Sequence, residues 1–148
     1  MSKIDNASFD TTLHVYDHCL CFAAQRAARA LARRFDEALA PFGLTSGQFS
    51  LLTSLNQPKP PSIGSIASLL VMDRTTLTAN LKPLERRGLV RISVDPADRR
   101  ARRLTLTTAG RRILRSAMAT WERTHGEIDG RLAHTEAKAL RAGLRALA

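Results

Sequence analysis

The chain lacks the features that mark membrane-spanning, secreted and disulfide-stabilised proteins. No run of about 18 apolar residues occurs among its 148 residues, so we expect no membrane-spanning helix. The first ten residues lack the basic and then apolar segments of a secretory signal. Cys19 and Cys21 are the only cysteines, which is too few for a disulfide framework or a structural zinc site. These absences favour a cytoplasmic protein.

Aromatic and acidic residues are also scarce. Aromatics make up 5% of the chain, which argues against proteins that stack single-stranded bases on aromatic rings. Lys and Arg number 23 against 13 Asp and Glu, so the formal net charge is +10. The 44% hydrophobic content is typical of one folded domain of this length. The positive charge favours a polyanionic partner, either nucleic acid or an acidic membrane surface.

Apolar periodicity divides the chain into helices and one pair of short strands. Leucines and alanines recur at three- and four-residue steps in the helical segments, whereas two short segments alternate as in strands. Ser62 and Asp73 are placed to cap helices, and Gly88 is placed to end one. The predicted helices span residues 13–40, about 45–55, 62–70, 73–88, 108–124 and about 135–147, and the predicted strands span residues 89–94 and 103–107.

Two short tandem helices followed by a hairpin are the layout of a winged helix-turn-helix. We therefore expect a mainly α fold with a small β-hairpin wing, in a single domain over residues 1–148. The DNA-binding lobe would cover about residues 45–107. The flanking helices, residues 13–40 and 108–148, carry apolar stripes with no third element to bury them. A second copy of the chain is the simplest cover, since two-fold homodimers are the commonest oligomers.

Three blocks of sequence, within a match from about residue 13 to 147, resemble the MarR family of bacterial transcription regulators. They are Gly43-Leu44-Thr45 with Gln48-Phe49, the segment from Asp73 to Val90, and Asp95-Pro96-Ala97-Asp98-Arg99-Arg100 with the segment from Leu104 to Gly110. The resemblance implies a homodimeric winged-helix repressor or activator. Such a protein reads a short palindrome in double-stranded DNA and is released by a small-molecule effector or by oxidation.

Candidate DNA contacts lie on the helix at residues 73–88 and in the hairpin loop. Leucines at 100° per residue share one arc of that helix, and threonines and cations occupy the opposite arc. Threonines suit base edges near the start of a recognition helix, and Lys82 suits phosphate or guanine. The resemblance implies that an arginine of the loop enters the minor groove. We assign this role to Arg100, and we expect Asp98 to orient it or a neighbouring arginine by a charge-assisted pair. The predicted DNA-contacting residues are Arg74, Thr75, Thr76, Thr78, Lys82, Asp98, Arg99, Arg100 and Arg102.

The charge distribution and the absence of catalytic motifs favour DNA binding over an enzyme or a membrane-surface protein. Residues 73–112 hold eleven Lys and Arg against four Asp and Glu, which predicts a steep loss of DNA affinity with salt. An enzyme is disfavoured, because no paired acids, nucleophile motif or phosphate-binding glycine loop is present. A membrane-surface protein is disfavoured because the arginines are split between helices and a hairpin loop. A sequence-indifferent architectural DNA-binding protein stays as the alternative. It would bind all duplexes equally, whereas a regulator prefers its own site by ~10³-fold or more.

The signal that would release the protein from DNA has three candidates. Cys21 lies in a segment similar to that of the reactive cysteine in the hydroperoxide-sensing branch of the family. The tyrosines of that branch are replaced by Phe35 and Ser46, and the alternative is that Cys21 is a small buried apolar residue. The second candidate is a small aromatic or amphipathic effector in a cleft between the dimer helices and the winged lobe, lined by Phe49, Trp121 and nearby arginines. The alternative is that these residues belong to the core.

The third candidate is a metal ion, although we predict no cofactor. His14, His18 and Cys21 are spaced four and three residues apart, so a continuous helix would place them on one face. Such side chains are suitable ligands for zinc, copper or nickel. The alternative is that both histidines face solvent.

Overall fold

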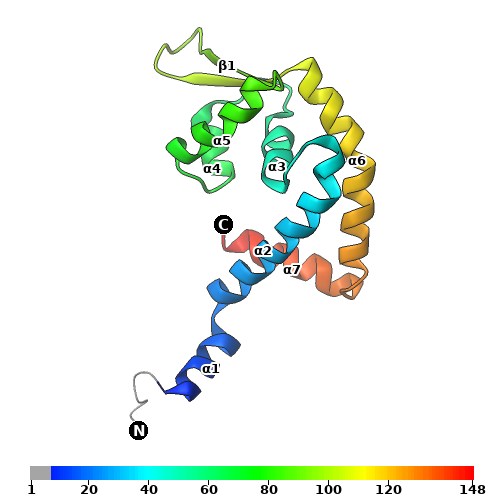
Figure 1. The fold of residues 1–148 in the computed structure, drawn as a ribbon. Helices are drawn as coiled ribbons and strands as arrows, with labels where there is room; N and C mark the ends of the chain where they lie inside the picture. Colours follow the sequence, from blue (N-terminus) through cyan, green and yellow to red (C-terminus); the bar gives the residue numbers. More distant parts are fainter. Residues whose placement is uncertain (1–7) are drawn as a thin grey trace.

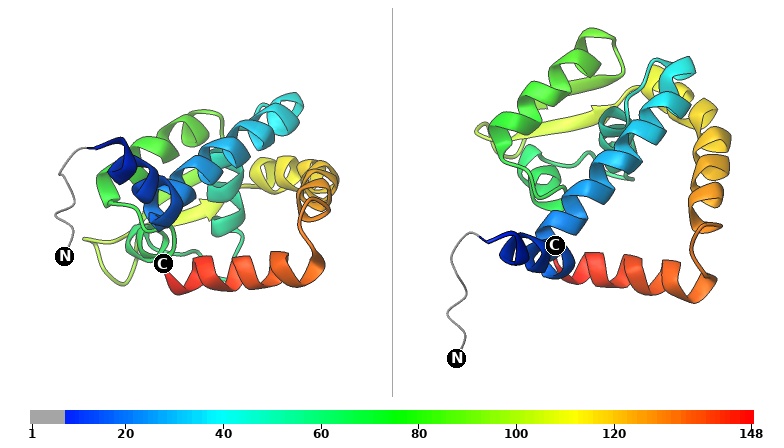
Figure 2. Two further views of the ribbon diagram at one scale, coloured as in Figure 1. Left: turned by 90° about the horizontal axis from the view of Figure 1, so that it is seen from below. Right: turned by 60° about the horizontal axis from the view of Figure 1, so that its bottom comes forward.

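The computed structural model describes residues 8–148, except for the side chains of residues 134 and 135. The elements are α1 (Phe9–His18), α2 (Leu20–Leu39), η1 (Ala40–Phe42), α3 (Ser46–Leu55), α4 (Ile63–Leu69), α5 (Arg74–Arg86), β1 (Val90–Val94), β2 (Arg102–Leu106), α6 (Thr108–Asp129) and α7 (His134–Ala146). Helices α3, α4 and α5 and the hairpin form one lobe, from which α2 and α6 lead away to the terminal helices α1 and α7 (Figures 1 and 2). The mainly α fold with a hairpin wing is confirmed.

Side-chain caps fix where four helices of the lobe and its flank begin. Thr45, Ser62, Asp73 and Thr107 each have extended backbone angles, and each side chain accepts a hydrogen bond from a backbone N–H of the following helix. At Thr45 the Gln48 side chain also accepts from the cap's own N–H, which completes a capping box. The predicted caps at Ser62 and Asp73 are confirmed.

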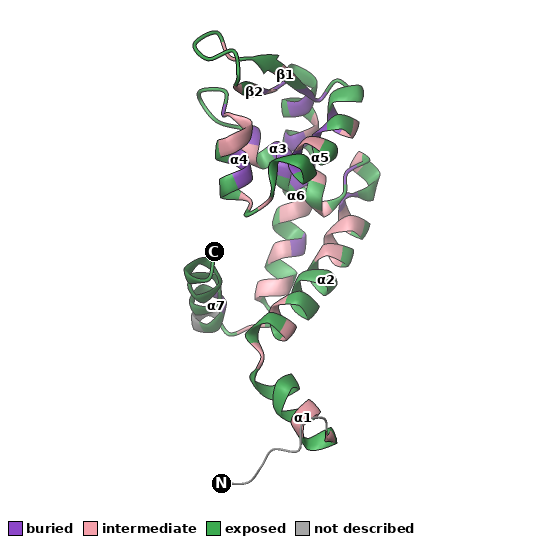
Figure 3. Ribbon diagram, turned by 90° about the vertical axis from the view of Figure 1, so that its left-hand side faces the viewer, coloured by how far each residue is buried: buried purple, intermediate pink, exposed green. Residues whose placement is uncertain are grey.

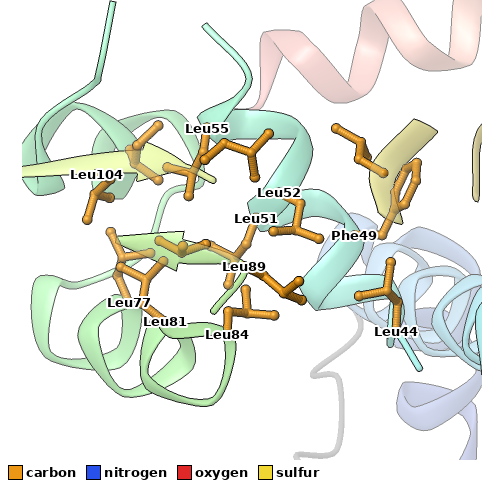
Figure 4. Packing of buried hydrophobic residues seen from close by; sticks show 14 of the residues in the cluster. Leu44, Phe49, Leu51, Leu52, Leu55, Leu77, Leu81, Leu84, Leu89 and Leu104 are labelled. Carbon is orange, nitrogen blue, oxygen red and sulfur yellow. The ribbon is translucent and has the colours of Figure 1, made fainter. Parts of the chain in front are cut away.

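The core of the lobe is a hydrophobic cluster, rich in leucine, to which each helix and strand of the lobe contributes. Leu77, Leu81 and Leu84 of α5 are fully buried and point toward α3 and the hairpin (Figure 4). Leu104 on β2 and Leu52 on α3 are also fully buried in this cluster. Burial of the predicted leucine arc turns the opposite arc of α5 outward, which is what a recognition helix requires.

The hairpin is tied to the start of α4 as well as to itself. β1 and β2 pair antiparallel, with Val90 opposite Leu106 and Val94 opposite Arg102. The N–H of Leu104 also donates to the Pro61 carbonyl at 2.8 Å, so the proline-rich loop before α4 lies against β2. The wing is thereby held beside the two tandem helices.

Two turns of the lobe use left-handed backbone conformations. Gly88 follows α5 with φ 71°, as predicted. Val71, in the turn between α4 and α5, has φ 51° and is the one non-glycine residue with positive φ among residues 8–148. A β-branched side chain disfavours this conformation, so the helix-turn-helix turn is strained.

Two predicted helix boundaries are wrong. The helix predicted over residues 13–40 is interrupted at Cys19, whose backbone is extended (φ −81°, ψ 106°) and whose thiol accepts from the Phe22 N–H at 3.4 Å. Periodicity could not show this break, because apolar positions continue through it. Helix α6 continues beyond residue 124 to Asp129. Its last turns are held by the Arg34–Glu127 ion pair to α2 and by Arg141 of α7, which binds Asp129 at 2.9 Å.

The terminal helices expose large apolar side chains to solvent. On α1 and the start of α2, Tyr16 is 52% exposed and Leu20 69% exposed. Leu140 and Leu144 on α7 and Leu147 just after it are about half exposed or more, and Figure 3 shows this helix apart from the buried core. The flanking helices therefore have apolar faces that this chain leaves uncovered. None of the described helices is long and apolar enough to cross a membrane.

Candidate nucleic-acid interface

The outward face of α5 forms a shallow hollow of hydroxyls and cations, which we call the helix hollow. Its volume is about 490 Å³, and it is lined by Arg74, Thr75, Thr78, Ala79, Lys82, Pro83 and Arg86. Among the described residues, none of its three cations has a carboxylate within 4 Å. These positive charges are therefore available to bind an anion.

The threonines at the start of α5 differ in what their hydroxyls can offer a ligand. The Thr76 hydroxyl donates to Asp73 Oδ2 at 2.7 Å, and the Thr78 hydroxyl donates to the Arg74 carbonyl at 2.8 Å. Within residues 8–148 the Thr75 hydroxyl has no such partner. Thr75 is thus the free donor, whereas Thr76 and Thr78 present methyl groups and oxygen lone pairs. The backbone N–H and then the hydroxyl of Thr76 lower the pKa of Asp73, so the cap stays ionised at neutral pH.

An acidic residue other than the predicted one pairs with an arginine in the wing. Asp95 binds Arg103 Nε at 3.0 Å. Its pKa is lowered first by the hydrogen bond from the Ala97 N–H and then by Arg103. Asp98 instead accepts from the Arg100 backbone N–H at 3.0 Å. The expected side-chain pair of Asp98 is therefore wrong, because its carboxylate is engaged with the loop backbone.

The remaining loop arginines are exposed. Arg102 Nη1 donates to the carbonyls of Arg99 and Ala101, at 3.1 and 3.3 Å, and this folds the loop back on itself. In the part of the chain that the structure describes, Arg99 and Arg100 have no carboxylate within 4 Å. Their charges stay available at the loop tip.

A second hollow joins the wing loop to α5, and we call it the wing hollow. It has a volume of about 420 Å³ and includes Ser62 and Gly64 from the start of α4. Arg74 and Thr78 line both hollows. Of the predicted DNA-contacting residues, the structure places Arg74, Thr75, Thr78, Lys82, Asp98, Arg100 and Arg102 around these two adjoining hollows. Thr76 and Arg99 line neither of them.

Sequence reasoning missed Ser62 and Gly64 as members of this surface. Ser62 was recognised only as a cap, and no feature of the sequence marks Gly64 as lying beside the wing. Their place depends on the tertiary bridge between Ser62 and Arg103 of β2. This bridge and the hydrogen bond from the Leu104 N–H to the Pro61 carbonyl bring the start of α4 to the wing.

Cys21 is exposed on α2, so its interpretation as a small buried residue is wrong for the single chain. Its one polar contact among residues 8–148 is with the Gln25 amide, which donates to the sulfur at 3.4 Å. Phe35 and Ser46 line a hollow elsewhere, and Cys21 is not part of it. The thiol is accessible to an oxidant in this chain.

Phe49 and Trp121 do lie together, as the effector prediction requires. Their rings stack with centroids 6.2 Å apart, and both line a hollow of about 190 Å³ between α2, α3 and α6. His125, rather than the expected arginines, supplies the ionisable group of its wall. The hollow is smaller than the roughly 300 Å³ or more of a typical ligand pocket. Phe49 also belongs to the core cluster.

The structure does not assemble the three candidate metal ligands. His14 and His18 stack with ring centroids 4.2 Å apart, and His18 Nδ1 contacts the His14 carbonyl at 2.9 Å. The interruption at Cys19 separates them from Cys21, which lies on a different helix. Over the described ranges, no group of three or more His, Cys, Asp or Glu is arranged to hold a metal ion.

Comparison with known proteins identifies relatives over most of this fold. Residues 44–101, from α3 to the wing loop, match the model of the MarR family. The transcriptional regulator TtmR of Methylorubrum extorquens is 40% identical over 95 residues, covering 64% of this chain and 49% of TtmR. The repressor NicR of Pseudomonas putida is 32% identical over 113 residues, covering 76% of this chain and 68% of NicR. The chain thus spans about half the length of the first curated relatives it matches.

Solved structures with a similar fold are also transcriptional regulators. The repressor CouR bound to a 23-mer DNA duplex superposes with a TM-score of 0.80 at 30% identity, covering 90% of this chain and 94% of CouR. CouR of Rhodococcus jostii RHA1 bound to p-coumaroyl-CoA superposes with a TM-score of 0.76 at 26% identity, covering 88% and 92%. From the match of the family model, the identity to NicR over two thirds of its length and the shared fold, we conclude that this chain belongs to the MarR family of transcriptional regulators.

Proposed function

We propose that the protein is a cytoplasmic transcriptional regulator that binds a pseudo-palindromic operator in double-stranded DNA as a homodimer. The observation that carries this proposal is the pair of adjoining hollows on α5 and the wing. Both are lined by cations without carboxylate partners in the described part of the chain. An unpaired cationic surface beside an outward-facing helix is suited to a duplex with its phosphates.

The helix hollow and the wing hollow would contact different grooves of the DNA. Helix α5 presents Thr75 and Lys82 on its outward face, where side chains of a recognition helix meet base edges and phosphates in the major groove. The wing loop presents Arg100, which suits a narrow minor groove with its strong negative potential. The minor groove adjoins the major groove on DNA, just as the wing hollow adjoins the helix hollow on the protein.

The homodimer is supported by the uncovered apolar faces of α1, α2 and α7. Leu140, Leu144 and Leu147 would each bury apolar surface at about 25 cal/mol per Å² if a second chain covered them. A two-fold dimer would present two copies of α5 to half-sites one helical turn apart, about 34–36 Å. We take the active form to be a repressor, because NicR and CouR are named repressors.

Release from DNA by an effector or by oxidation completes the proposal. The Phe49–Trp121 hollow lies between α2, α6 and the DNA-binding lobe, so a ligand that enlarged it would change how the lobe sits on its supporting helices. The exposed Cys21 thiol is the alternative trigger, since a sensor cysteine requires access to its oxidant. The two triggers act at different residues and are separable by mutation.

Selection of bound duplexes from a random library, followed by gel shifts, tests the proposal. We expect one pseudo-palindrome to be enriched and bound ~10³-fold more tightly than its scrambled duplex. Equal binding of all duplexes would identify the architectural alternative. DNA upstream of the protein's own gene should then be shifted, with the shift repeated in hydroperoxide and in reductant. Loss of binding in hydroperoxide that Cys21→Ser abolishes would assign the trigger to oxidation, and retained binding would leave the effector.

A further inference from the structure

Gly64 lies directly beneath the guanidinium of Arg74. A Cβ built on Gly64 would lie 2.9 Å from Arg74 Nη2 and 3.5 Å from Cζ. Ordinary van der Waals contacts of a Cβ are 3.4–4 Å long, so a methyl group at residue 64 would require this guanidinium to move from its present place. The guanidinium therefore rests on the backbone of α4, although Arg74 itself belongs to α5.

The backbone conformation of Gly64 does not itself require a glycine. Gly43 and Gly88 have positive φ, but Gly64 does not. Glycine within a helix costs roughly 0.5–1 kcal/mol relative to alanine. The Arg74 side chain supplies the contacts within 4 Å that a Cβ would meet. The missing side chain thus serves the placement of Arg74.

Arg74 occupies the boundary between the two hollows. It shares the helix hollow with Thr75 and Lys82 and the wing hollow with Ser62 and Arg100. Within residues 8–148 its guanidinium has no carboxylate within 4 Å. In a duplex, the ridge between the major and the minor groove is a phosphodiester backbone. A guanidinium at this boundary can bind phosphate oxygens in a bidentate manner.

We propose that the junction of the two hollows is a phosphodiester-binding seat and that Gly64 is its positioning residue. Gly64 leaves space for the Arg74 guanidinium to lie across α4, where it binds the DNA strand that separates the groove read by α5 from the groove read by the wing loop. This inference rests on the proposed function and adds one phosphate contact and the residue that places it.

Gly64→Ala tests the seat, and Gly47→Ala is the matched control. Each glycine is the second residue of a capped helix, and a Cβ on Gly47 would meet only Thr45 Oγ1, at an ordinary 3.9 Å. Binding of the full chain to its selected duplex is measured by fluorescence anisotropy at several salt concentrations. Thermal unfolding of each variant checks the fold.

We expect Gly64→Ala to weaken duplex binding by about ten- to a hundredfold, the value of one hydrogen bond to a charged group. The slope of log affinity against log salt should fall by about 0.9, which corresponds to one phosphate. Gly47→Ala should bind as the wild type does. The melting temperature of Gly64→Ala should not fall, because the overlap is with the end of a flexible side chain.

A double-mutant cycle shows whether the effect acts through Arg74. Arg74→Gln should weaken binding to a similar extent, and adding Gly64→Ala to it should cause no further loss. Wild-type affinity in Gly64→Ala, or an equal further loss in the Arg74→Gln background, would overturn the inference. Failure of the proposed function is distinguishable, because the unmutated chain itself would then show no preference for the selected duplex.

Discussion

Gly110 allows α6 to start in close contact with the DNA-binding lobe. Gly110→Ala should therefore push α6 away from the start of the hairpin. A Cβ at Gly110 would lie 2.2 Å from the Leu89 carbonyl oxygen and 2.7 Å from Leu106 Cδ1. The first neighbour is backbone, and it also accepts from the Thr107 N–H at 3.1 Å. Either α6 or the start of the hairpin must move by about 1 Å or more to restore an ordinary contact. The variant thus perturbs the joint between the lobe and its supporting helix.

The expected cost follows from these contacts. Overpacking costs about 1–3 kcal/mol and loss of the hydrogen bond about 1 kcal/mol, while helix propensity returns up to about 1 kcal/mol. The free energy of unfolding should therefore fall by about 1–3 kcal/mol. For a chain of this size, that lowers the melting temperature by about 3–10 °C.

Thermal unfolding followed by circular dichroism measures the effect, at one protein concentration because a dimer's stability depends on it. Gly126→Ala is the control in the same helix, since a Cβ there has no neighbour within 4 Å. The control should match the wild type or exceed its stability by up to about 1 kcal/mol. A Gly110→Ala protein as stable as the control would refute the close packing of α6 on the lobe.

Three other substitutions probe the wing, the turn and the cap of α5. Arg100→Ala should weaken binding to the selected duplex and lower its salt slope by about 0.9 while the dimer stays intact, as anisotropy and sedimentation would show; unchanged affinity at physiological salt would remove Arg100 from the interface. Val71→Gly should raise the free energy of unfolding by about 0.5–1 kcal/mol in urea titrations, because it relieves a left-handed β-branched residue; a loss of stability would contradict the strain. The pKa of Asp73 is held below its usual 3.8, so its stabilising effect is complete above that pH and is lost as pH falls through the lowered pKa. Stability of Asp73→Asn should therefore change less than that of the wild type on acidification below about pH 4, and parallel acid-unfolding curves would argue against the ionised cap.

Sequence patterns predicted the buried face of α5 and the starts of α4 and α5, because these features depend on residues close together in the chain. The spacing of Leu77, Leu81 and Leu84 determined which face of α5 is buried, and the caps at Ser62 and Asp73 determined where helices begin. These features depend on residues three or four positions apart. Periodicity and cap chemistry report such neighbours directly.

Features that depend on backbone breaks or on distant segments were not predictable in this way. The interruption at Cys19 leaves the apolar pattern intact, so residues 13–40 resembled one helix. In the wing, Asp98 directly precedes Arg99, whereas the arginines nearest to Asp95 in sequence are four residues away. Only the folded loop shows that Asp95 binds Arg103 and that Asp98 binds a backbone N–H. The seat around Gly64 likewise needs two helices and the wing together.

The stoichiometry and selectivity of DNA binding test the central claim most directly. Fluorescence anisotropy titrations, with the mass of the complex determined by sedimentation, compare the selected pseudo-palindrome with its scrambled sequence. We predict a complex of two chains on one duplex, with a preference of ~10³-fold or more over the scrambled DNA. A single chain per duplex with equal affinity for both sequences would contradict the account.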